Sequence, residues 1–363
     1  MSTTDPSTPA DPLADHPHHE YHDLAVEKVI EETADARSVV FRIPADVADT
    51  FRYKAGQFLT VKVPYDGKDL VRCYSLASSP DCESEHKVTI KRVVDGRISN
   101  WINDSLSAGD VMKVLPPGGL FTLRDGTHPV VLFAGGSGIT PVISIIKTAL
   151  ETTGRALKLV YANRDRGSII FEEELQKLAA REPARLEVVH SLDDVDGFLD
   201  VERVTREVTG FEDAEFYVCG PGVFMDVVEE ALEALGTPGE RIHIERFVSP
   251  PDPDAAAAAH AEEAAEIAGD VAPETINVQL DGETHDVAYE RGQTVLVSCQ
   301  KAGLEPPFSC TDGFCGCCMA QLTAGEVRMI NNDFLSDKEV KDGWVLTCQS
   351  VPLTRACGVK YPD

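Results

Sequence analysis

Four cysteines near the C-terminal end constrain the fold of this chain more than any other feature. Cys310, Cys315 and Cys318 lie on one loop, with four and then two residues between them, and Cys348 follows further along the chain. This C-x4-C-x2-C…C spacing is typical of plant-type [2Fe–2S] clusters, in which four thiolates hold the iron–sulfur core. The sequence therefore predicts a fold that brings one distant cysteine to a tight three-cysteine loop.

Zinc is the main alternative metal for these cysteines. Zinc sites usually combine paired Cys-x2–4-Cys knuckles. Here three cysteines share one loop and the fourth is distant. Gly313 and Gly316 let the loop turn sharply and bring backbone N–H groups near sulfur. Cys317 has the wrong spacing, and we predict that it is not a ligand.

The size and charge of the chain limit its class. Its 363 residues suggest two or three domains, and 33 basic against 61 acidic residues give a formal net charge of −28. Nucleic acid and anionic membrane surfaces both require a positive protein face, so neither is an expected partner. The sequence has neither an apolar run of about 18 residues nor a signal-peptide pattern. We expect a cytoplasmic monomer.

Two segments are predicted to lie outside the domains. Residues 1–20 are rich in polar residues and proline, which favours disorder. Residues 248–273 combine prolines with an alanine and glutamate tract, which we interpret as a linker with a helix over 255–268. An alternative for the tail is a metal site formed by its histidines: His16, His18, His19 and His22.

Residues 21–125 contain short, regularly spaced strand patterns. Ser38–Ile43 is rich in β-branched and aromatic residues, Tyr53–Val63 alternates after its glycine, and Val88–Val94 alternates in its first half. Such a series of short strands separated by turns predicts a small antiparallel β-barrel.

The pattern changes in residues 126–247. Pro129–Ala134 is a continuous apolar run, as in a strand buried on both faces. Three further strand patterns alternate with helical ones, and they cover Leu157–Ala162, Leu186–His190 and Glu215–Gly220. Alternating strands and helices predict a doubly wound parallel sheet.

Residues 274–363 begin with a predicted hairpin. Ile276–Leu280 alternates, Asp281-Gly282 forms the turn, and His285–Tyr289 forms the return strand. A helical pattern over Thr294–Ala302 then leads into the cysteine loop. The segment 251–363 holds 19 acidic and 7 basic residues, a net charge of 7 − 19 = −12. We expect this acidic segment to bind a protein partner with a basic face.

Two further motifs are weaker when taken singly. The turn Gly135–Pro141 joins a strand to a helix and offers unpaired N–H groups to a phosphate, although it lacks the third glycine of G-x-G-x-x-G. Arg72-Cys73-Tyr74-Ser75 provides a cation for a diphosphate and a ring for stacking. Alone, each motif also fits a purely structural role, as a tight turn or an ordinary barrel strand.

In combination, these motifs resemble the ferredoxin–NADP reductase superfamily over residues 21–247, with Cys219-Gly220-Pro221 as a third shared stretch. The last segment resembles a plant-type ferredoxin of the β-grasp fold. The order of the flavin, nicotinamide and cluster regions along the chain is similar to that in the reductase components of multicomponent oxygenases. This group includes phenylacetate-type reductases and those serving 3-ketosteroid 9α-hydroxylases. The stretches that carry this likeness are Arg72–Leu76, Tyr161–Asp165 and Pro307–Cys310.

The resemblance implies roles for individual residues. It implies that Ser75, Cys219 and Glu245 position a nicotinamide against a flavin, and that the four spaced cysteines hold the cluster. The implied FAD-binding residues are Arg72, Cys73, Tyr74, Ser75, Thr89, Ile90, Lys91, Gly96, Arg97, Ile98, Ser99, Thr140 and Phe247. The implied NAD-binding residues are Gly135, Gly136, Ser137, Gly138, Ile139, Thr140, Pro141, Asn163, Arg164, Cys219, Gly220 and Pro221.

The resemblance also implies an electron path from NADH through FAD and the cluster to a terminal oxygenase, of Rieske type and for steroids in the first hypothesis. A diiron hydroxylase or an acyl-CoA epoxidase is the alternative partner, and a redox-sensing binding protein is a third possibility. Arg164 and Arg166 would suit the 2′-phosphate of NADPH, but Asp165 lies between them. We therefore favour NADH and leave NADPH open.

Overall fold

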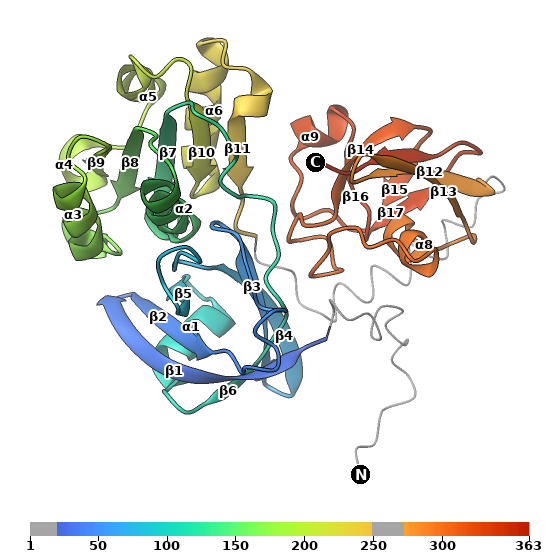
Figure 1. Cartoon of the computed structure of the whole chain (residues 1–363), viewed down its shortest axis with the longest axis horizontal. Helices are drawn as coiled ribbons and strands as arrows, with labels where there is room; N and C mark the ends of the chain where they lie inside the picture. The colour runs from blue at the N-terminus through green and yellow to red at the C-terminus, as the bar shows by residue number, and fades with distance from the viewer. Residues whose placement is uncertain (1–19, 249–271, 363) are drawn as a thin grey trace. The chain divides into compact units, whose positions relative to one another are not determined.

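A computed structural model describes residues 20–248 and 272–362 of the chain. Nearly all of the predicted tail and linker lie outside the described residues, including the predicted helix over 255–268. The chain divides into two compact units, one over Asp23–Phe247 and one that contains the C-terminal residues (Figure 1). The first unit comprises a barrel and an α/β layer.

The barrel is the predicted antiparallel one. Its six-stranded sheet has the order β4-β3-β6-β1-β2-β5. A bridge between Leu76 and Val88 joins the ends of the two outer strands and closes the sheet around a core of aliphatic side chains. The strands are β1 (His22–Thr33), β2 (Ala36–Arg42), β3 (Phe58–Tyr65), β4 (Lys68–Ser75), β5 (His86–Lys91) and β6 (Val111–Val114).

Two local features of the barrel differ from the sequence prediction. The strand predicted from Tyr53 begins only at Phe58, because Gly56 turns the chain with a positive φ of 98°. An unpredicted helix, α1 (Arg97–Ser105), follows β5, and it buries Ile98 and Ile102 against the barrel core. Its asparagine and serine residues have modest helix propensity, so packing of the two isoleucines stabilises it.

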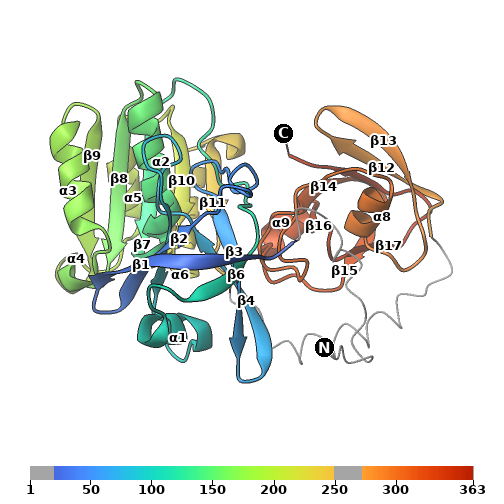
Figure 2. The same cartoon turned by 60° about the horizontal axis from the view of Figure 1, so that its bottom comes forward.

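The α/β layer is the predicted doubly wound parallel sheet (Figure 2). Its order is β11-β10-β7-β8-β9, and one core lies on each face. The strands are β7 (Val130–Gly135), β8 (Leu157–Asn163), β9 (Leu186–Leu192), β10 (Glu215–Cys219) and β11 (Ile242–Glu245). Helices α2 (Ile139–Thr152) and α3 (Glu172–Arg181) contribute to one core, and α5 (Val201–Val208) and α6 (Gly222–Ala234) to the other.

The strand order places a switch point at β7. The chain continues from β7 to its neighbour β8 on one side and returns later to its neighbour β10 on the other. Ligands of open α/β sheets bind outside the carboxyl ends of the strands at such a point. The Gly135–Pro141 turn and the Cys219–Pro221 stretch both follow these carboxyl ends.

The C-terminal unit has the predicted β-grasp arrangement. Asp281 and Gly282 both have positive φ, as the two-residue turn between β12 and β13 requires. The mixed sheet has the order β13-β12-β18-β14-β16, and β15 pairs with β17. The elements are β12 (Thr275–Leu280), β13 (Glu283–Ala288), α8 (Val295–Lys301), β14 (Met319–Ala324), β15 (Val327–Met329), α9 (Asp337–Lys341), β16 (Trp344–Leu346), β17 (Ser350–Pro352) and β18 (Gly358–Lys360).

Within residues 20–248 and 272–362, helices are too short or too polar to cross a membrane.

Candidate functional site

The end of β4 presents the predicted flavin residues. Side chains alternate along a strand, so Arg72 and Tyr74 share one face while Cys73 and Ser75 share the other. Burial lowers the pKa of the Arg72 guanidinium and raises that of the Tyr74 hydroxyl. The Cys73 thiol lies 3.3 Å from the buried Thr60 hydroxyl, so it contributes to strand packing rather than to the Arg72 face.

The N-terminus of α1 contains the next predicted FAD-binding residues, Gly96 to Ser99. Gly96 precedes it without any side-chain cap, which leaves backbone N–H groups for an anion. A Cβ at Gly96 would lie 2.5 Å from the Ser99 hydroxyl, so only glycine fits there. Positive charge on Arg97 contributes to the lowered pKa of Arg72, which means that two guanidiniums share this corner. The arrangement fits a diphosphate.

The predicted residues of β5 contribute unequally. Thr89 is buried and its hydroxyl lies 2.7 Å from that of Ser38, and the Ile90 side chain belongs to the barrel core. Only their backbone groups can therefore face a cofactor. Lys91 is half-buried, and its Nζ lies 3.7 Å from where a Cβ on Gly136 would be. This lysine therefore lies beside the glycine-rich turn of the α/β layer.

Glycine is required along that turn by close backbone packing. A Cβ on Gly138 would lie 2.0 Å from the Cys219 carbonyl oxygen, and one on Gly135 would lie 2.8 Å from the Pro221 ring. The turn therefore packs directly on the end of β10. Ile139 and Pro141 are buried at the start of α2, and the Thr140 hydroxyl donates to the Ser137 carbonyl at 3.0 Å.

Three predicted side chains meet where the barrel contacts the α/β layer. Cys219 and Glu245 are paired residues at the carboxyl ends of β10 and β11, and the Ser75 hydroxyl lies 3.5 Å from a Glu245 carboxylate oxygen. Burial raises the pKa of Glu245 to about 8 and that of Cys219 well above its usual range. The group therefore consists of a hydroxyl, a thiol and a carboxyl that stays protonated near neutral pH.

The remaining predicted residues lie around this group. Asn163 ends β8, and its buried amide atoms have no hydrogen-bond partner within the described part of the chain. Phe247 follows β11 and its side chain is 45% exposed, which leaves a face for a cofactor ring. An orphaned buried amide and an exposed aromatic both fit a site that is completed by a ligand.

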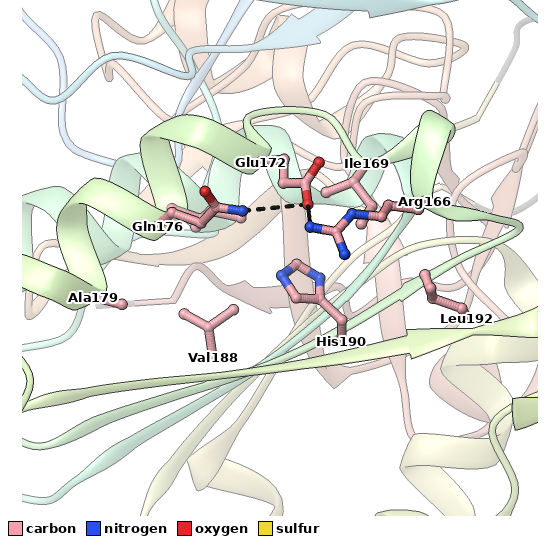
Figure 3. Close-up of a pocket in the computed structure, with 9 residues that line it drawn as sticks. Arg166, Ile169, Glu172, Gln176, Ala179, Val188, His190 and Leu192 are labelled. Carbon is pink, nitrogen blue, oxygen red and sulfur yellow. Dashed lines mark hydrogen bonds and ion pairs between the residues drawn. The ribbon is translucent and has the colours of Figure 1, made fainter. Parts of the chain in front are cut away.

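The arginines considered for a 2′-phosphate are both paired with carboxylates. Arg164 Nε lies 2.7 Å from Asp165, and Arg166 lies 2.8 Å from Glu172. Figure 3 shows the Arg166–Glu172 pair above His190, in a pocket of about 350 Å³ between α3 and β9. The other residues that line this pocket are Ile169, Leu175, Gln176, Ala179, Val188 and Leu192.

Sequence reasoning missed a buried ion cluster that joins the barrel to the α/β layer. Lys147 on α2 lies 2.9 Å from Glu83 of the barrel and 2.7 Å from Glu174 on α3. Lys87 of the barrel lies 3.4 Å from the same Glu174 and 5.1 Å from the centre of the Phe171 ring. These residues are far apart in sequence and follow no motif, so no local pattern could have revealed them.

In the C-terminal unit the four predicted ligands are all buried and form two pairs. The Cys310 N–H donates to Cys315 Sγ at 3.5 Å. A hydrogen bond between the Cys318 and Cys348 thiols lowers the pKa of Cys318 and raises that of Cys348. Within the described residues, no three His, Cys, Asp or Glu side chains are grouped as ligands of a single ion. Electrostatic interactions of Cys310 with Cys318, and of Cys348 with Cys310 and Cys315, show that all four thiols lie close together, as a [2Fe–2S] core requires.

The cysteine loop has the geometry that its glycines suggested. Gly313 and Gly316 have φ values of 83° and 69°. A Cβ on Gly316 would lie 2.3 Å from the Phe334 ring, and one on Gly313 would lie 2.8 Å from the Asn331 carbonyl oxygen. The loop is further held by the Gln349 side chain, which donates to the Thr311 carbonyl at 2.5 Å.

Comparison with known proteins agrees with this arrangement. Residues 23–123 match an oxidoreductase FAD-binding domain, 132–230 an oxidoreductase NAD-binding domain, and 278–353 a 2Fe-2S iron-sulfur cluster binding domain. The ferredoxin reductase component of 3-ketosteroid-9-alpha-monooxygenase from Rhodococcus rhodochrous is 45% identical over 93% of this chain and 96% of that protein. This chain belongs to the family of oxygenase reductase components.

Other members of this reductase family differ in partner. One of the subunits of 1,2-phenylacetyl-CoA epoxidase from Escherichia coli is 32% identical over 92% of this chain and 96% of that protein. A solved structure of phthalate dioxygenase reductase, 24% identical, matches over 97% of this chain and 100% of that one with a TM-score of 0.58. The predicted three-part architecture and its cofactors, FAD, NAD and [2Fe–2S], are therefore confirmed for this NAD(P)H-dependent reductase.

Proposed function

We propose that this reductase passes electrons from NADH through FAD and a [2Fe–2S] cluster to a Rieske-type terminal oxygenase that hydroxylates 3-ketosteroids. The observation that carries the steroid proposal is the full-length similarity to the steroid monooxygenase reductase described above. We further infer that the reductase is monomeric and meets its oxygenase in the cytoplasm, where NADH is made.

Ser75, Cys219 and Glu245 are the proposed positioning groups for the nicotinamide. They come from three strand ends that converge where the barrel contacts the α/β layer. Because burial keeps Cys219 and Glu245 protonated, the site adds no negative charge beside a hydride donor. Fixed geometry at such a site lowers the barrier by holding the reacting atoms in contact.

The proposed cofactor residues divide by the part of the cofactor that they suit. Arg72, Arg97 and the α1 N-terminus suit the FAD diphosphate, and Tyr74 and Phe247 suit the flavin ring. The turn from Gly135 to Pro141 suits the NAD diphosphate. When bound, FAD accepts two electrons together and releases them singly, which is what a one-electron cluster downstream of a hydride donor requires.

The proposed ligands of the cluster are the two thiol pairs, Cys310 with Cys315 and Cys318 with Cys348. Each pair would hold one iron, and the buried loop, whose Gly313 and Gly316 adopt positive φ, would exclude water from the sulfurs. Thiolates bind iron only after losing their protons, so cluster assembly would offset the cost of burying four sulfur atoms.

Charge around the end of β8 favours NADH over NADPH. Arg164 is already paired with Asp165. The Asp194 N–H donates to the Arg164 carbonyl at 3.2 Å, which places the acidic pair Asp193 and Asp194 beside it. Carboxylates can accept hydrogen bonds from ribose hydroxyls, but they repel a 2′-phosphate. The pairing of Arg166 with Glu172 removes the other candidate cation.

The test of this function is reconstitution with purified oxygenases. The reductase, NADH, oxygen and a Rieske-type 3-ketosteroid oxygenase should give 9α-hydroxylated product, with NADPH a much poorer donor. A parallel reaction uses 1,2-phenylacetyl-CoA epoxidase, because one of its subunits is similar to this chain. Turnover with the epoxidase alone would contradict the steroid proposal but leave the electron path intact. Slow NADH oxidation with ferricyanide would contradict the path itself.

A further inference from the structure

Two buried hydroxyl groups form a hydrogen-bonded chain that ends on a proposed cluster ligand. The Tyr361 hydroxyl donates to Thr347 Oγ1 at 2.9 Å, and the Thr347 hydroxyl donates to the Cys318 carbonyl oxygen at 2.9 Å. The Thr347 backbone N–H donates to the same carbonyl at 3.1 Å. The two hydroxyl protons therefore point the same way, from Tyr361 toward Cys318.

Thr347 connects the two cysteines of the second thiol pair. It precedes Cys348 in the chain and hydrogen-bonds to the backbone of Cys318 through both its N–H and its hydroxyl. The Thr347 carbonyl in turn accepts from the Leu296 N–H of α8 at 3.0 Å. Thr347 is therefore fixed from both sides, and its position sets the distance between Cys318 and Cys348.

Tyr361 is held with similar rigidity. Its ring is 2% exposed, and its backbone N–H donates to the Gln279 carbonyl of β12 at 2.9 Å. It follows β18, the strand between β12 and β14 in the sheet. The Tyr361 hydroxyl also has the buried Cys299 thiol as a neighbour, and a thiol is a weak hydrogen-bond partner, so a hydroxyl that loses Thr347 here has only a weak substitute.

We propose that Tyr361 is a positioning residue for the cluster, which acts through Thr347 to fix the Cys318–Cys348 pair and to raise the cluster's reduction potential. The inference rests on the cluster ligands proposed above. Reduction adds one negative charge to the cluster. The donors act on the Cys318 backbone carbonyl, so they position this ligand residue and direct their positive ends toward the cluster, and outer residues of this kind tune metal sites.

The test measures the cluster's midpoint potential by an anaerobic titration followed by electron paramagnetic resonance. Tyr361→Phe should lower the potential by about 40 mV, which corresponds to a fivefold change in a one-electron equilibrium at 59 mV per tenfold. Thr347→Val should lower it at least as much, and Thr347→Ser should keep it unchanged. Tyr361→Phe should not lower the potential further in the Thr347→Val background. The hydrogen-bonded chain from Tyr361 through Thr347 to Cys318, which we call the relay, is already broken there.

The matched control is Tyr289→Phe. Tyr289 lies in the same hydrophobic core, and its hydroxyl has no hydrogen-bond partner within residues 20–248 and 272–362. An equal shift in Tyr361→Phe and Tyr289→Phe, or an undiminished Tyr361→Phe shift in the Thr347→Val background, would overturn the relay. Equal potentials in Thr347→Val and Thr347→Ser would overturn it even if Tyr361→Phe fails to fold.

Iron and sulfide content distinguish the relay from the ligand assignment on which it rests. A full cluster in Cys318→Ser would contradict the assignment of Cys318 as a cluster ligand. A full cluster with unchanged potential in Tyr361→Phe would contradict only the relay.

Discussion

The two redox regions both bury ionisable groups, but they deal with the charge in opposite ways. Around Glu245 and Cys219, burial holds the protons on, and the site is neutral. Around Cys310, Cys315, Cys318 and Cys348, three buried thiols of one loop meet a fourth from beyond β16, and they suit a metal core that replaces their protons. Similar burial therefore serves a proton-retaining site in one region and a metal-binding site in the other.

The difference follows from what each site must exchange. Charge buried without a partner is costly, so the site that we propose to orient a hydride donor is best left neutral. A cluster site carries permanent negative charge, which iron and directed N–H and O–H donors offset. Four predictions, in order of decreasing effect, test whether the two regions differ in this way.

Removing one thiol should abolish the cluster while leaving the flavin side intact. Cys318→Ser should lose the cluster's visible absorbance and its iron, because one iron would keep only a single thiolate from its pair. NADH should still bleach the flavin. The control is Cys317→Ser, an equally buried neighbour that should retain the cluster. Loss of the cluster in Cys317→Ser alone would show the third ligand to be wrong.

The raised pKa of Glu245 predicts a pH-dependent stability. An acid whose pKa rises from 4.5 to about 8 on folding stabilises the fold most below pH 4.5. That contribution is lost as pH rises from 4.5 to about 8, because over this range the unfolded chain has released the proton that the folded chain still retains. The loss is about 5 kcal/mol at 1.36 kcal/mol per pKa unit.

Glu245→Gln should remove this dependence, because glutamine is neutral at every pH. The measurement is urea denaturation of the variant and the parent between pH 5 and pH 9. The variant should gain stability relative to the parent as pH rises. A constant difference between the two across this range would mean that Glu245 is ionised in the folded protein.

The same region predicts a kinetic effect. Cys219→Ala should slow flavin reduction by NADH about 10²-fold in stopped-flow measurements, because a small misplacement of the nicotinamide costs that much. The cluster's spectrum and potential should not change. Cys73→Ala is the control. Cys73 lies on the same strand, β4, as Ser75, but its thiol contacts Thr60 of β3. Equal slowing in both variants would point to a general packing defect.

The smallest expected effect concerns coenzyme choice. Asp193→Ser combined with Asp194→Arg should raise kcat/KM for NADPH about tenfold, since removing repulsion and adding a cation is worth about 1.4 kcal/mol. The kcat/KM for NADH should fall slightly. Glu172→Gln, which frees Arg166 at the pocket shown in Figure 3, tests whether the other arginine contributes. Unchanged NADPH use in all variants would place the 2′-phosphate elsewhere.

Much of the architecture was predictable because local patterns encoded it. The buried run Pro129–Ala134, the alternating strands and the Asp281-Gly282 turn each specify their structure through short-range sequence. The cysteine spacing likewise encodes a loop, because three of the four cysteines lie within nine residues of one another. Helix α1 was missed, because its stability comes from packing Ile98 and Ile102 and not from propensity.

The features that lay beyond prediction depend on long-range contacts. Glu83, Lys147 and Glu174 form one cluster only after the barrel has packed on the α/β layer. Tyr361 reaches Thr347 only because β18 inserts between β12 and β14. An isolated tyrosine near a chain end has no sequence signal for such a role. That Ser75 and Glu245 belong to one site could be expected only from the family resemblance, since the two are distant in sequence.

The Lys147 ion cluster has a consequence for ionic strength. Its lysine is 4% exposed, and salt screens buried pairs far less than exposed ones. The fit between the barrel and the α/β layer should therefore be insensitive to salt. Docking through an acidic, solvent-exposed surface is screened strongly. The proposed docking of an oxygenase on the acidic C-terminal segment should therefore slow as salt rises, while the rate at which NADH reduces the flavin should not change.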